Sequence, residues 1–307
     1  MENISKPKIL VSRCLGFEPV RWNGIVIQDD FIKKLVRYVD FETVCPEVEI
    51  GLGVPRDPIR IVKKDKSYFL IQHNTEKDIT EKMEKFSKNF LKNQGNFDGV
   101  ILKEKSPSCG IKNVKVFNRE GNVVENGSGF FAKNVLEFYT DIPVESEGRL
   151  KNLYLKENFL TKIFLISNFR KLEKNMNKLI NFHSQNKYLF LSYNQRMLRD
   201  LGKIVANHEN YDIDTVFLFY EQVLFSGLKI NYRRTSFYNT FLHILGYFKD
   251  RIKKDEKDFI LENLNEFKNE KLDLTTVLKL LQSYVIRFDI EYLKEQTIFK
   301  PFPKNLI

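Results

Sequence analysis

The segment Phe-Asp-Gly-Val-Ile-Leu-Lys-Glu-Lys-Ser-Pro-Ser-Cys-Gly, residues 97–110, joins an apolar run to a loop that carries one of the three cysteines in the chain. The run Phe97–Leu102 predicts a buried strand. Cys14 follows a second such run, Lys8–Ser12, and Cys45 ends a third that begins at Glu42. Because the strands of one buried sheet bring their loops to the same edge, we expect the three cysteines to meet there.

The rest of this half alternates between predicted strands and helices. We expect helices over 31–38 (after an N-cap at Asp29 or Asp30), 76–91 and 130–138, strands over 59–62 and 68–72, and a hairpin over 114–124. The alternation predicts a layered α/β domain, Rossmann-like, with a mostly parallel sheet. Ligands of such folds bind outside the carboxyl ends of the strands, where the cysteines fall.

The net charge of +10 is unevenly distributed. Residues 1–148 contain 23 Lys and Arg against 22 Asp and Glu, whereas residues 149–307 contain 27 against 18. The second half, at +9, therefore suits a polyanion such as nucleic acid. The alternative is that a composition rich in Lys, Asn and Phe reflects only a biased genome.

Composition also indicates where the protein works. No signal-like segment opens the sequence, and the longest apolar candidate, 215–228, contains Glu221 and Gln222. Three widely spaced cysteines do not resemble a disulfide framework. We expect a cytoplasmic protein without a membrane span, whose cysteines are free thiols, metal ligands or catalytic groups.

Three thiolates suit zinc or an iron–sulfur cluster. Structural zinc normally takes four ligands, and His73 is the only histidine of this half, in an expected surface turn. A [4Fe-4S] cluster on Cys14, Cys45 and Cys109 leaves one iron without a protein ligand, open to a soft substrate sulfur. Three unrelated cysteines are the remaining alternative.

Polar residues flank these cysteines. Glu47 lies two residues after Cys45 and offers a carboxylate for proton transfer, and Ser106 and Ser108 flank Cys109. Their hydroxyls, with that of Ser12, can hydrogen-bond a substrate or cluster sulfides. Alternatively, the serines only shape turns.

A loop rich in glycine follows the second cysteine. In Gly-Leu-Gly-Val-Pro-Arg, residues 51–56, the glycines allow a ligand to approach the backbone, and Arg56 offers a guanidinium to an anion or a base edge. An ordinary flexible turn with a solvated arginine fits the same residues. We predict a contact of Arg56 with substrate or RNA.

Five ordered motifs resemble the thiouracil desulfidase family. They are Ser-Arg-Cys-Leu-Gly (12–16), Pro-Val-Arg-Trp-Asn-Gly (19–24), Cys-Pro-Glu-Val (45–48), Gly-Leu-Gly-Val-Pro-Arg (51–56) and Lys-Ser-Pro-Ser-Cys-Gly (105–110). The resemblance implies a [4Fe-4S] cluster on the three cysteines, with one iron that takes the sulfur of a thiolated uracil. It also implies proton transfer by Glu47 and substrate contact by Ser106. Arg13 departs from the small residue of many relatives, which leaves the substrate range open.

The second half is predicted to be all-α. Glycine and proline become rare and apolar residues recur at helical spacing, so we divide the chain into domains 1–147 and 148–307. Basic residues follow the same spacing at 170–178 and at Arg196, Arg199 and Lys203, and Arg233 and Arg234 follow Asn231-Tyr232. We predict RNA contacts for Arg196, Arg199, Arg233 and Arg234. Each cluster alone is also compatible with a solvated helix face.

Three segments of this half are similar to the YbgA-type helical domain. They cover 182–188, 239–249 and 296–303. The fused architecture resembles the desulfidases that act on 4-thiouridine in tRNA, which implies thiolated tRNA as the partner. Two alternatives stay open: an enzyme for small thiopyrimidines with a structural helical domain, and a non-enzymatic, zinc-containing RNA-binding protein. Monomer and dimer are both open.

Overall fold

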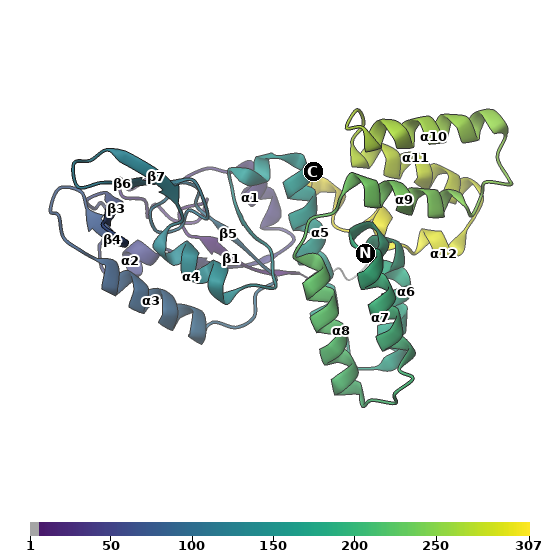
Figure 1. Ribbon diagram of the computed structural model, residues 1–307, viewed down its shortest axis with the longest axis horizontal. Coiled ribbons are helices and arrows are strands. Elements are labelled where there is room, and N and C mark those ends of the chain that lie inside the picture. The colour runs from purple at the N-terminus through teal and green to yellow at the C-terminus, as the bar shows by residue number, and fades with distance from the viewer. Residues whose placement is uncertain (1–5) are drawn as a thin grey trace. The chain divides into compact units, whose positions relative to one another are not determined.

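The computed structural model describes residues 6–307 and shows two compact units (Figure 1). The first unit comprises the residues up to Asn168 together with Pro303–Ile307, and the second comprises Phe169–Phe302. The first contains all the strands and the second is built from helices. The predicted class, an α/β domain followed by an all-α domain, is confirmed.

A four-stranded parallel sheet forms the centre of the first unit. Its strand order is β2-β1-β5-β8, with β2 at Asp40–Val44, β1 at Lys8–Ser12, β5 at Gly99–Leu102 and β8 at Val144–Ser146. All three pairings are parallel. The residues of β5 are all buried, as are those of β1 after Lys8, which explains their continuous apolar sequences.

A second sheet was not anticipated from the sequence. Its order is β4-β3-β6-β7, with β3 at Ile59–Lys64, β4 at Ser67–Gln72, β6 at Val114–Phe117 and β7 at Val123–Gly127. The β3/β4 and β6/β7 pairs are antiparallel, and β3/β6 is parallel. Short connections allow only antiparallel pairing, so each hairpin is antiparallel, and the parallel β3/β6 pair joins the two hairpins into one mixed sheet.

The helices of the first unit largely follow the predicted pattern. They are α1 at Asp30–Leu35, α2 at Pro46–Glu49, α3 at Thr80–Asn93, α4 at Phe130–Phe138 and most of α5 at Leu153–Arg170, with short 3-10 turns η1 at Arg149–Lys151 and η3 at Lys304–Leu306. Asp29 caps α1 by accepting from the Ile32 N–H. Helix α3 starts later than the expected Glu76, because the Asp57 carboxylate holds the N–H groups of Asn74 and Thr75 in a turn.

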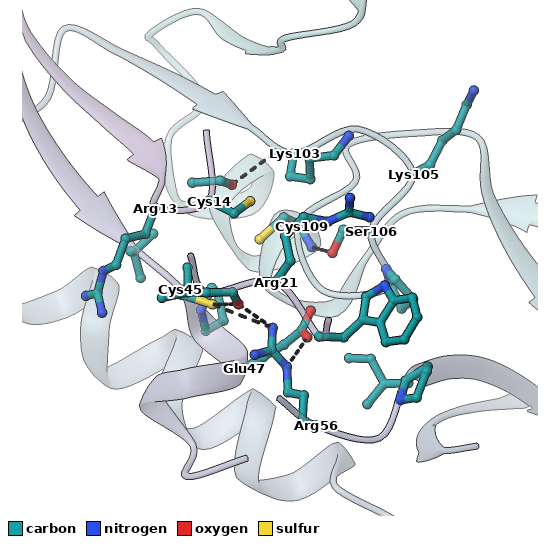
Figure 2. A pocket seen from close by; sticks show the side chains of 18 of the residues that line it. Arg13, Cys14, Arg21, Cys45, Glu47, Arg56, Lys103, Lys105, Ser106 and Cys109 are labelled. Carbon is teal, nitrogen blue, oxygen red and sulfur yellow. Dashed lines mark hydrogen bonds and ion pairs between the residues drawn. The ribbon is translucent and has the colours of Figure 1, made fainter. Parts of the chain in front are cut away.

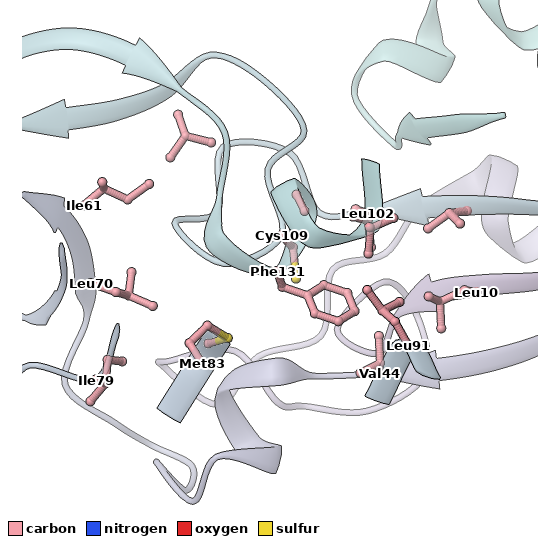
Figure 3. Packing of buried hydrophobic residues seen from close by; sticks show 14 of the residues in the cluster. Leu10, Val44, Ile61, Leu70, Ile79, Met83, Leu91, Leu102, Cys109 and Phe131 are labelled. Carbon is pink, nitrogen blue, oxygen red and sulfur yellow. The ribbon is translucent and has the colours of Figure 1, made fainter. Parts of the chain in front are cut away.

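One apolar core joins both sheets to helices α3 and α4. Figure 3 shows Phe131 of α4 among side chains of the sheets and of α3. The rings of Phe86 and Phe90 lie 6.3 Å and 5.9 Å from that of Phe131. Cys109 belongs to the same cluster, so the loop after β5 is anchored in the core.

The expected domain boundary lies inside ordered structure. The polar stretch around residue 147 contains β8, and α5 packs on the parallel sheet. A Cβ at Gly99 would lie 2.6 Å from Ile163 and 3.2 Å from Phe159, so only glycine allows β5 to approach α5 this closely. The sequence pattern changes at 147/148, whereas the compact units divide at 168/169.

The second unit contains the end of α5 and seven further helices. They are α6 at Met176–Tyr193, α7 at Gln195–Ala206, α8 at Ile213–Leu228, α9 at Arg234–Leu245, α10 at Lys254–Lys268, α11 at Leu274–Arg287 and α12 at Glu291–Lys294, followed by the 3-10 turn η2 at Thr297–Phe299. Asn and Asp side chains cap α6, α7, α8 and α11, in accord with their N-cap preference.

The expected basic stripe over residues 170–178 does not form on one helix. Helix α5 ends at Arg170 and α6 begins at Met176, so the intervening lysines lie in a connection. Lys174 in this connection pairs with Asp214 of α8. Across the described residues 6–307, no helix combines the length and the apolar character that a membrane span requires.

Candidate functional site

Three neighbouring parallel strands deliver the three cysteines to one cavity. Cys45 follows β2, Cys14 follows β1 and Cys109 lies in the loop after β5, and all three line a cavity of about 380 Å³ (Figure 2). Glu47 and Ser106 line the same cavity. The structure thus brings together the residues that the strand-edge argument predicted to meet.

The three sulfur atoms are free thiols in a desolvated environment. Burial, with a smaller contribution from Cys45, raises the pKa of Cys14 to about 12. Burial also raises the pKa of Cys45, and it raises that of Cys109 well above 9.0 although a hydrogen bond from Ser12 opposes the shift. Burial thus favours the protonated form of the three thiols, and a metal that binds them would have to release their protons.

The raised pKa of Cys14 predicts a pH-dependent stability of the metal-free protein. Between its unfolded value of 9.0 and its folded value of about 12, the folded state retains a proton that the unfolded state has lost. Stability therefore falls as the pH rises through this range. From pH 8 to pH 10, we expect the free energy of unfolding to fall by about 1 kcal/mol more in the parent than in Cys14→Ala. Anaerobic urea denaturation under reducing conditions measures this difference, and equal pH dependence in both proteins would contradict it.

A chain of hydrogen bonds connects the predicted catalytic residues. The Ser108 hydroxyl donates to Glu47 Oε1 at 2.5 Å, and the Ser106 and Ser108 hydroxyl oxygens are 3.0 Å apart. Because an ionised carboxylate only accepts, the proton of Ser108 points to Glu47 and the Ser106 proton is directed to Ser108 or into the cavity. This arrangement can hold and move a proton beside the cysteines.

Arg56 is the partner of Glu47. Its Nε donates to Glu47 Oε2 at 2.8 Å, and the two side chains are 3% and 13% exposed. Its other nitrogens donate to the carbonyl oxygens of Gly53 at 2.9 Å and Val20 at 2.8 Å. The guanidinium predicted to contact substrate or RNA is thus occupied in orienting Glu47 and in holding two loops.

The loop from Ser106 to Gly110 is fixed to the start of α4. The N–H groups of Phe130 and Ala132 donate to the carbonyl oxygens of Pro107 and Ser108 at 3.1 Å and 3.0 Å. A Cβ at Gly129 would lie 2.5 Å from the Ser108 oxygen, so glycine is required for this approach. The Cys109 N–H donates to Ser106 Oγ at 3.1 Å, which shapes the turn as the alternative interpretation of the serines predicted.

The cavity wall also contains an ion pair that the sequence did not predict. Lys103 lines the cavity, and its ammonium group contacts the buried carboxylate of Glu147. Glu147 Oε2 also accepts the Glu104 N–H at 2.8 Å, and the Lys103 N–H donates to Ser12 Oγ at 2.9 Å. The position of Lys103 directly after a predicted strand could have identified it as a candidate site residue. No sequence pattern, however, linked it to Glu147.

Arg13, the departure from the family pattern, also lines the cavity. Its Nη2 donates to Glu49 Oε1 of α2 at 2.7 Å. In Figure 2 its guanidinium extends away from the other labelled residues. Arg13 therefore contributes its stem to the cavity wall while its charge is neutralised outside it.

The three thiols that line the cavity are soft donors of the kind that hold an iron–sulfur cluster. Zinc contacts each sulfur ligand at about 2.3 Å, which requires the ligands to crowd around one point. Within the described residues 6–307, no three His, Cys, Asp or Glu side chains are grouped in that way. In an iron–sulfur cluster each thiolate binds a different iron. Three thiols around a cavity of this size therefore suit such a cluster.

The arginines predicted to contact RNA have different environments. Arg196 and Arg199 are exposed on α7, and Arg196 lies 3.5 Å from Asp200. Arg233 is exposed at the N-cap of α9. Arg234 instead donates to the carbonyl oxygens of Phe267, in the last turn of α10, and of Leu272, in the connection between α10 and α11, both at 2.7 Å. Arg234 is thus engaged in holding α10.

The fold and the site define an α/β domain with a cysteine-lined cavity, joined to an all-α domain. Residues 9–147 match the family model described as 2-thiouracil desulfurase, and residues 187–303 match that of a protein of unknown function (DUF1722). The chain belongs to the 2-thiouracil desulfurase family.

Curated relatives match each part of the chain. An uncharacterized protein, YbbK of Bacillus subtilis (strain 168), is 34% identical over 111 residues, which are 33% of this chain and 72% of that protein. The uncharacterized protein YbgA of Escherichia coli (strain K12) is 23% identical over 152 residues, which are 48% of this chain and 90% of that protein. Among solved structures, the [4Fe-4S]-dependent thiouracil desulfidase TudS is 29% identical with a TM-score of 0.38, covering 50% of this chain and 98% of TudS.

Proposed function

We propose that this protein removes the sulfur atom of a thiolated uracil by hydrolysis, and that its substrate is 4-thiouridine in tRNA. The observation that carries the proposal is the single cavity in which three thiols face the hydrogen-bonded chain from Ser106 to Glu47. Membership of the 2-thiouracil desulfurase family supports the reaction class. The helical half, with its charge of +9, supports a polyanionic substrate.

The residues that line the cavity have different proposed roles in the reaction. Cys14, Cys45 and Cys109 would hold a [4Fe-4S] cluster, which supplies a Lewis-acidic iron with an open position for the thiocarbonyl sulfur. Glu47 takes a proton from water as the new C–O bond forms at the ring carbon. The C–S bond breaks and the sulfur leaves as hydrosulfide, so no electrons are exchanged. Ser106 orients the heterocycle, while Arg56 fixes the orientation of the Glu47 carboxylate by a hydrogen bond.

The helical domain is proposed to hold the tRNA by its phosphates. Arg196, Arg199 and Lys203 are exposed on α7 at spacings that place them along one side of the helix. Lys and Arg that neutralise phosphates make binding strongly salt-dependent. We place the reaction in the cytoplasm, because all three cysteines are free thiols and that compartment keeps thiols reduced.

The test compares two substrates of the full-length protein after anaerobic reconstitution. We expect faster hydrosulfide release per enzyme from tRNA that contains 4-thiouridine than from free thiouracil, with uridine left in the tRNA. Activity on small thiopyrimidines alone would favour the alternative in which the helical domain is structural. Activity on neither substrate would contradict the desulfidase. Truncation near residue 148 is unsuitable, since α5 packs against the parallel sheet.

Charge reversal on α7 tests the role of the helical domain. In Arg196→Glu/Arg199→Glu we expect kcat/KM for thiolated tRNA to fall about tenfold or more, with that for free thiouracil unchanged. The slope of log affinity against log salt should decrease in magnitude by about 0.7 to 0.9 for each lost phosphate contact. Lys254→Glu/Lys257→Glu makes the same charge change on α10 and serves as the matched control. Equal losses in both double variants would remove α7 from the proposal.

A further inference from the structure

The proposed reaction requires two proton transfers in opposite directions. Glu47 takes a proton from water as the C–O bond forms, whereas the sulfur atom must gain a proton to leave as hydrosulfide. The carboxylate that activates water carries no proton, so in that state Glu47 only accepts hydrogen bonds. A donor for the departing sulfur therefore has to come from another side chain of the cavity wall.

Few side chains of the wall can release a proton. Three arginines line the cavity, but a guanidinium is not deprotonated in proteins, and serine hydroxyls are weak acids. The lining also contains Lys103 and Lys105. Lys105 is 74% exposed and pairs with Glu104 at 3.2 Å, and Figure 2 shows it extending away from the cysteines. Lys103, which is 23% exposed, is thus the acid that the wall offers to a ligand.

The Lys103 ammonium group has a donor to spare. It contacts the Glu147 carboxylate and donates to the Glu104 carbonyl oxygen at 3.0 Å. An ammonium group carries three N–H bonds, and within residues 6–307 the third has no acceptor. Because the Lys103 backbone N–H donates to Ser12 Oγ at 2.9 Å, the start of the side chain is also fixed. The third N–H bond is therefore available to a molecule in the cavity.

The fourth strand of the parallel sheet positions this lysine. Glu147 directly follows β8, just as cysteines follow the neighbouring strands. Its Oε1 contacts the Lys103 ammonium and its Oε2 accepts the Glu104 N–H at 2.8 Å, so both oxygens are engaged. Burial raises the pKa of Cys14, and the positive charge of Lys103 opposes that shift, which places the ammonium group near a thiol. The sheet thus brings an acid and three sulfur ligands to one edge.

We propose that Lys103 is the acid that protonates the sulfur atom as it leaves the ring, and that Glu147 positions its ammonium group. Lys103 gives one proton to the sulfur as the C–S bond breaks. Water supplies the oxygen of the new carbonyl, one of its protons goes to Glu47 and the other to solvent, and Lys103 regains a proton from Glu47. One water is consumed, one hydrosulfide and one proton are released, and no electrons are exchanged. The inference rests on the proposed function and adds a second catalytic residue to it.

Removal of the ammonium group tests the inference. In Lys103→Ala, reconstituted anaerobically as the full-length protein, we expect kcat for thiolated tRNA to fall about 10²- to 10⁴-fold. The iron content and the affinity for the uridine-containing product tRNA should stay at the parent values. Because this variant leaves the buried Glu147 carboxylate unpaired, Lys103→Ala/Glu147→Gln is measured beside it and should show the same loss of kcat.

Rescue by small amines separates an acid from a structural residue. Methylammonium and ethylammonium ions added to Lys103→Ala should restore part of the lost rate in proportion to their concentration, because an amine in solution replaces the missing acid. The same amines should leave Glu47→Gln unchanged. A purely structural loss would not respond to them.

The variant Lys103→Arg separates proton transfer from charge. Arginine keeps a cation opposite Glu147 but does not release its proton, so we expect parent-like iron content and product affinity together with a low kcat. Recovery of the parent kcat in this variant would assign Lys103 an electrostatic role and overturn the inference.

A second ion pair of the same domain provides the control. Lys63 and Glu125 pair at 3.1 Å in the mixed sheet and do not line the cavity, so Lys63→Ala/Glu125→Gln should keep the parent kcat within about threefold. An equally small effect of Lys103→Ala, a loss that amines do not relieve, or iron loss in all three Lys103 variants would overturn the inference. An inactive parent would instead contradict the proposed function, so the two failures are distinguishable.

Discussion

Cys109→Ala, reconstituted anaerobically, is expected to retain almost no iron and to release no hydrosulfide from any thiolated uracil. The parent should bind about four irons and at least four acid-labile sulfides per chain. Cys109 is buried in the core cluster, so its removal deletes a ligand that no neighbouring side chain can replace. Cys14→Ala and Cys45→Ala should lose iron to a similar extent.

Iron and sulfide analysis of the parent and the three variants provides the measurement. Ser87→Ala, a buried position on α3 outside the cavity, controls for a small loss of volume in the same domain. An iron content that is the same in the parent and in all three cysteine variants would contradict the proposed cluster and the function that depends on it. Stoichiometric zinc without iron in the parent would favour the non-enzymatic RNA-binding alternative.

Glu47→Gln should abolish most of the activity while leaving the iron content unchanged. The amide preserves the size of the side chain but cannot take a proton from water, and general base catalysis contributes about 10²- to 10⁴-fold. The substitution also leaves the buried Arg56 guanidinium without its counter-charge, which adds to the loss by disturbing the Gly53 and Val20 loops.

Glu49→Gln provides a matched control for this variant. Glu49 lies on the same short helix α2 and pairs with Arg13 at a more exposed position. Its substitution should change kcat by less than about threefold, since exposed ion pairs contribute little. Single-turnover rates of hydrosulfide release, measured at equal iron content, make the comparison. Equal effects of the two substitutions would assign Glu47 a general electrostatic role instead of proton transfer.

Local sequence determined the elements that carry the site. The apolar runs before Cys14, Cys45 and the loop of Cys109 are strands β1, β2 and β5, and α4 has the predicted bounds Phe130–Phe138. These features were predictable because hydrophobic periodicity and turn residues act over a few neighbours. The α/β and all-α classes of the two halves followed from the same periodicity.

The partition of the strands into two sheets could not be predicted from the sequence. Turn chemistry indicated hairpins at 114–124, but nothing in the sequence showed that β3 pairs with β6 across more than fifty residues. Likewise, Val144–Ser146 is too short and polar to be identified as a strand, and it exists because β5 offers it a free edge.

The sequence by itself thus determined the chemical repertoire of this protein: three thiols at strand ends, a carboxylate and hydroxyls beside them, and a basic helical half. Only the tertiary structure decided which charged side chains are paired within the protein and which are available to a ligand. It pairs Arg56 with Glu47 and Lys103 with Glu147 and engages Arg234 at the end of α10, whereas within residues 6–307 it gives the Arg21 guanidinium no hydrogen bond or ion pair. The reason is physical: a side chain's charge is available to a ligand only after burial and pairing with distant residues have been settled, and those depend on packing rather than on local sequence.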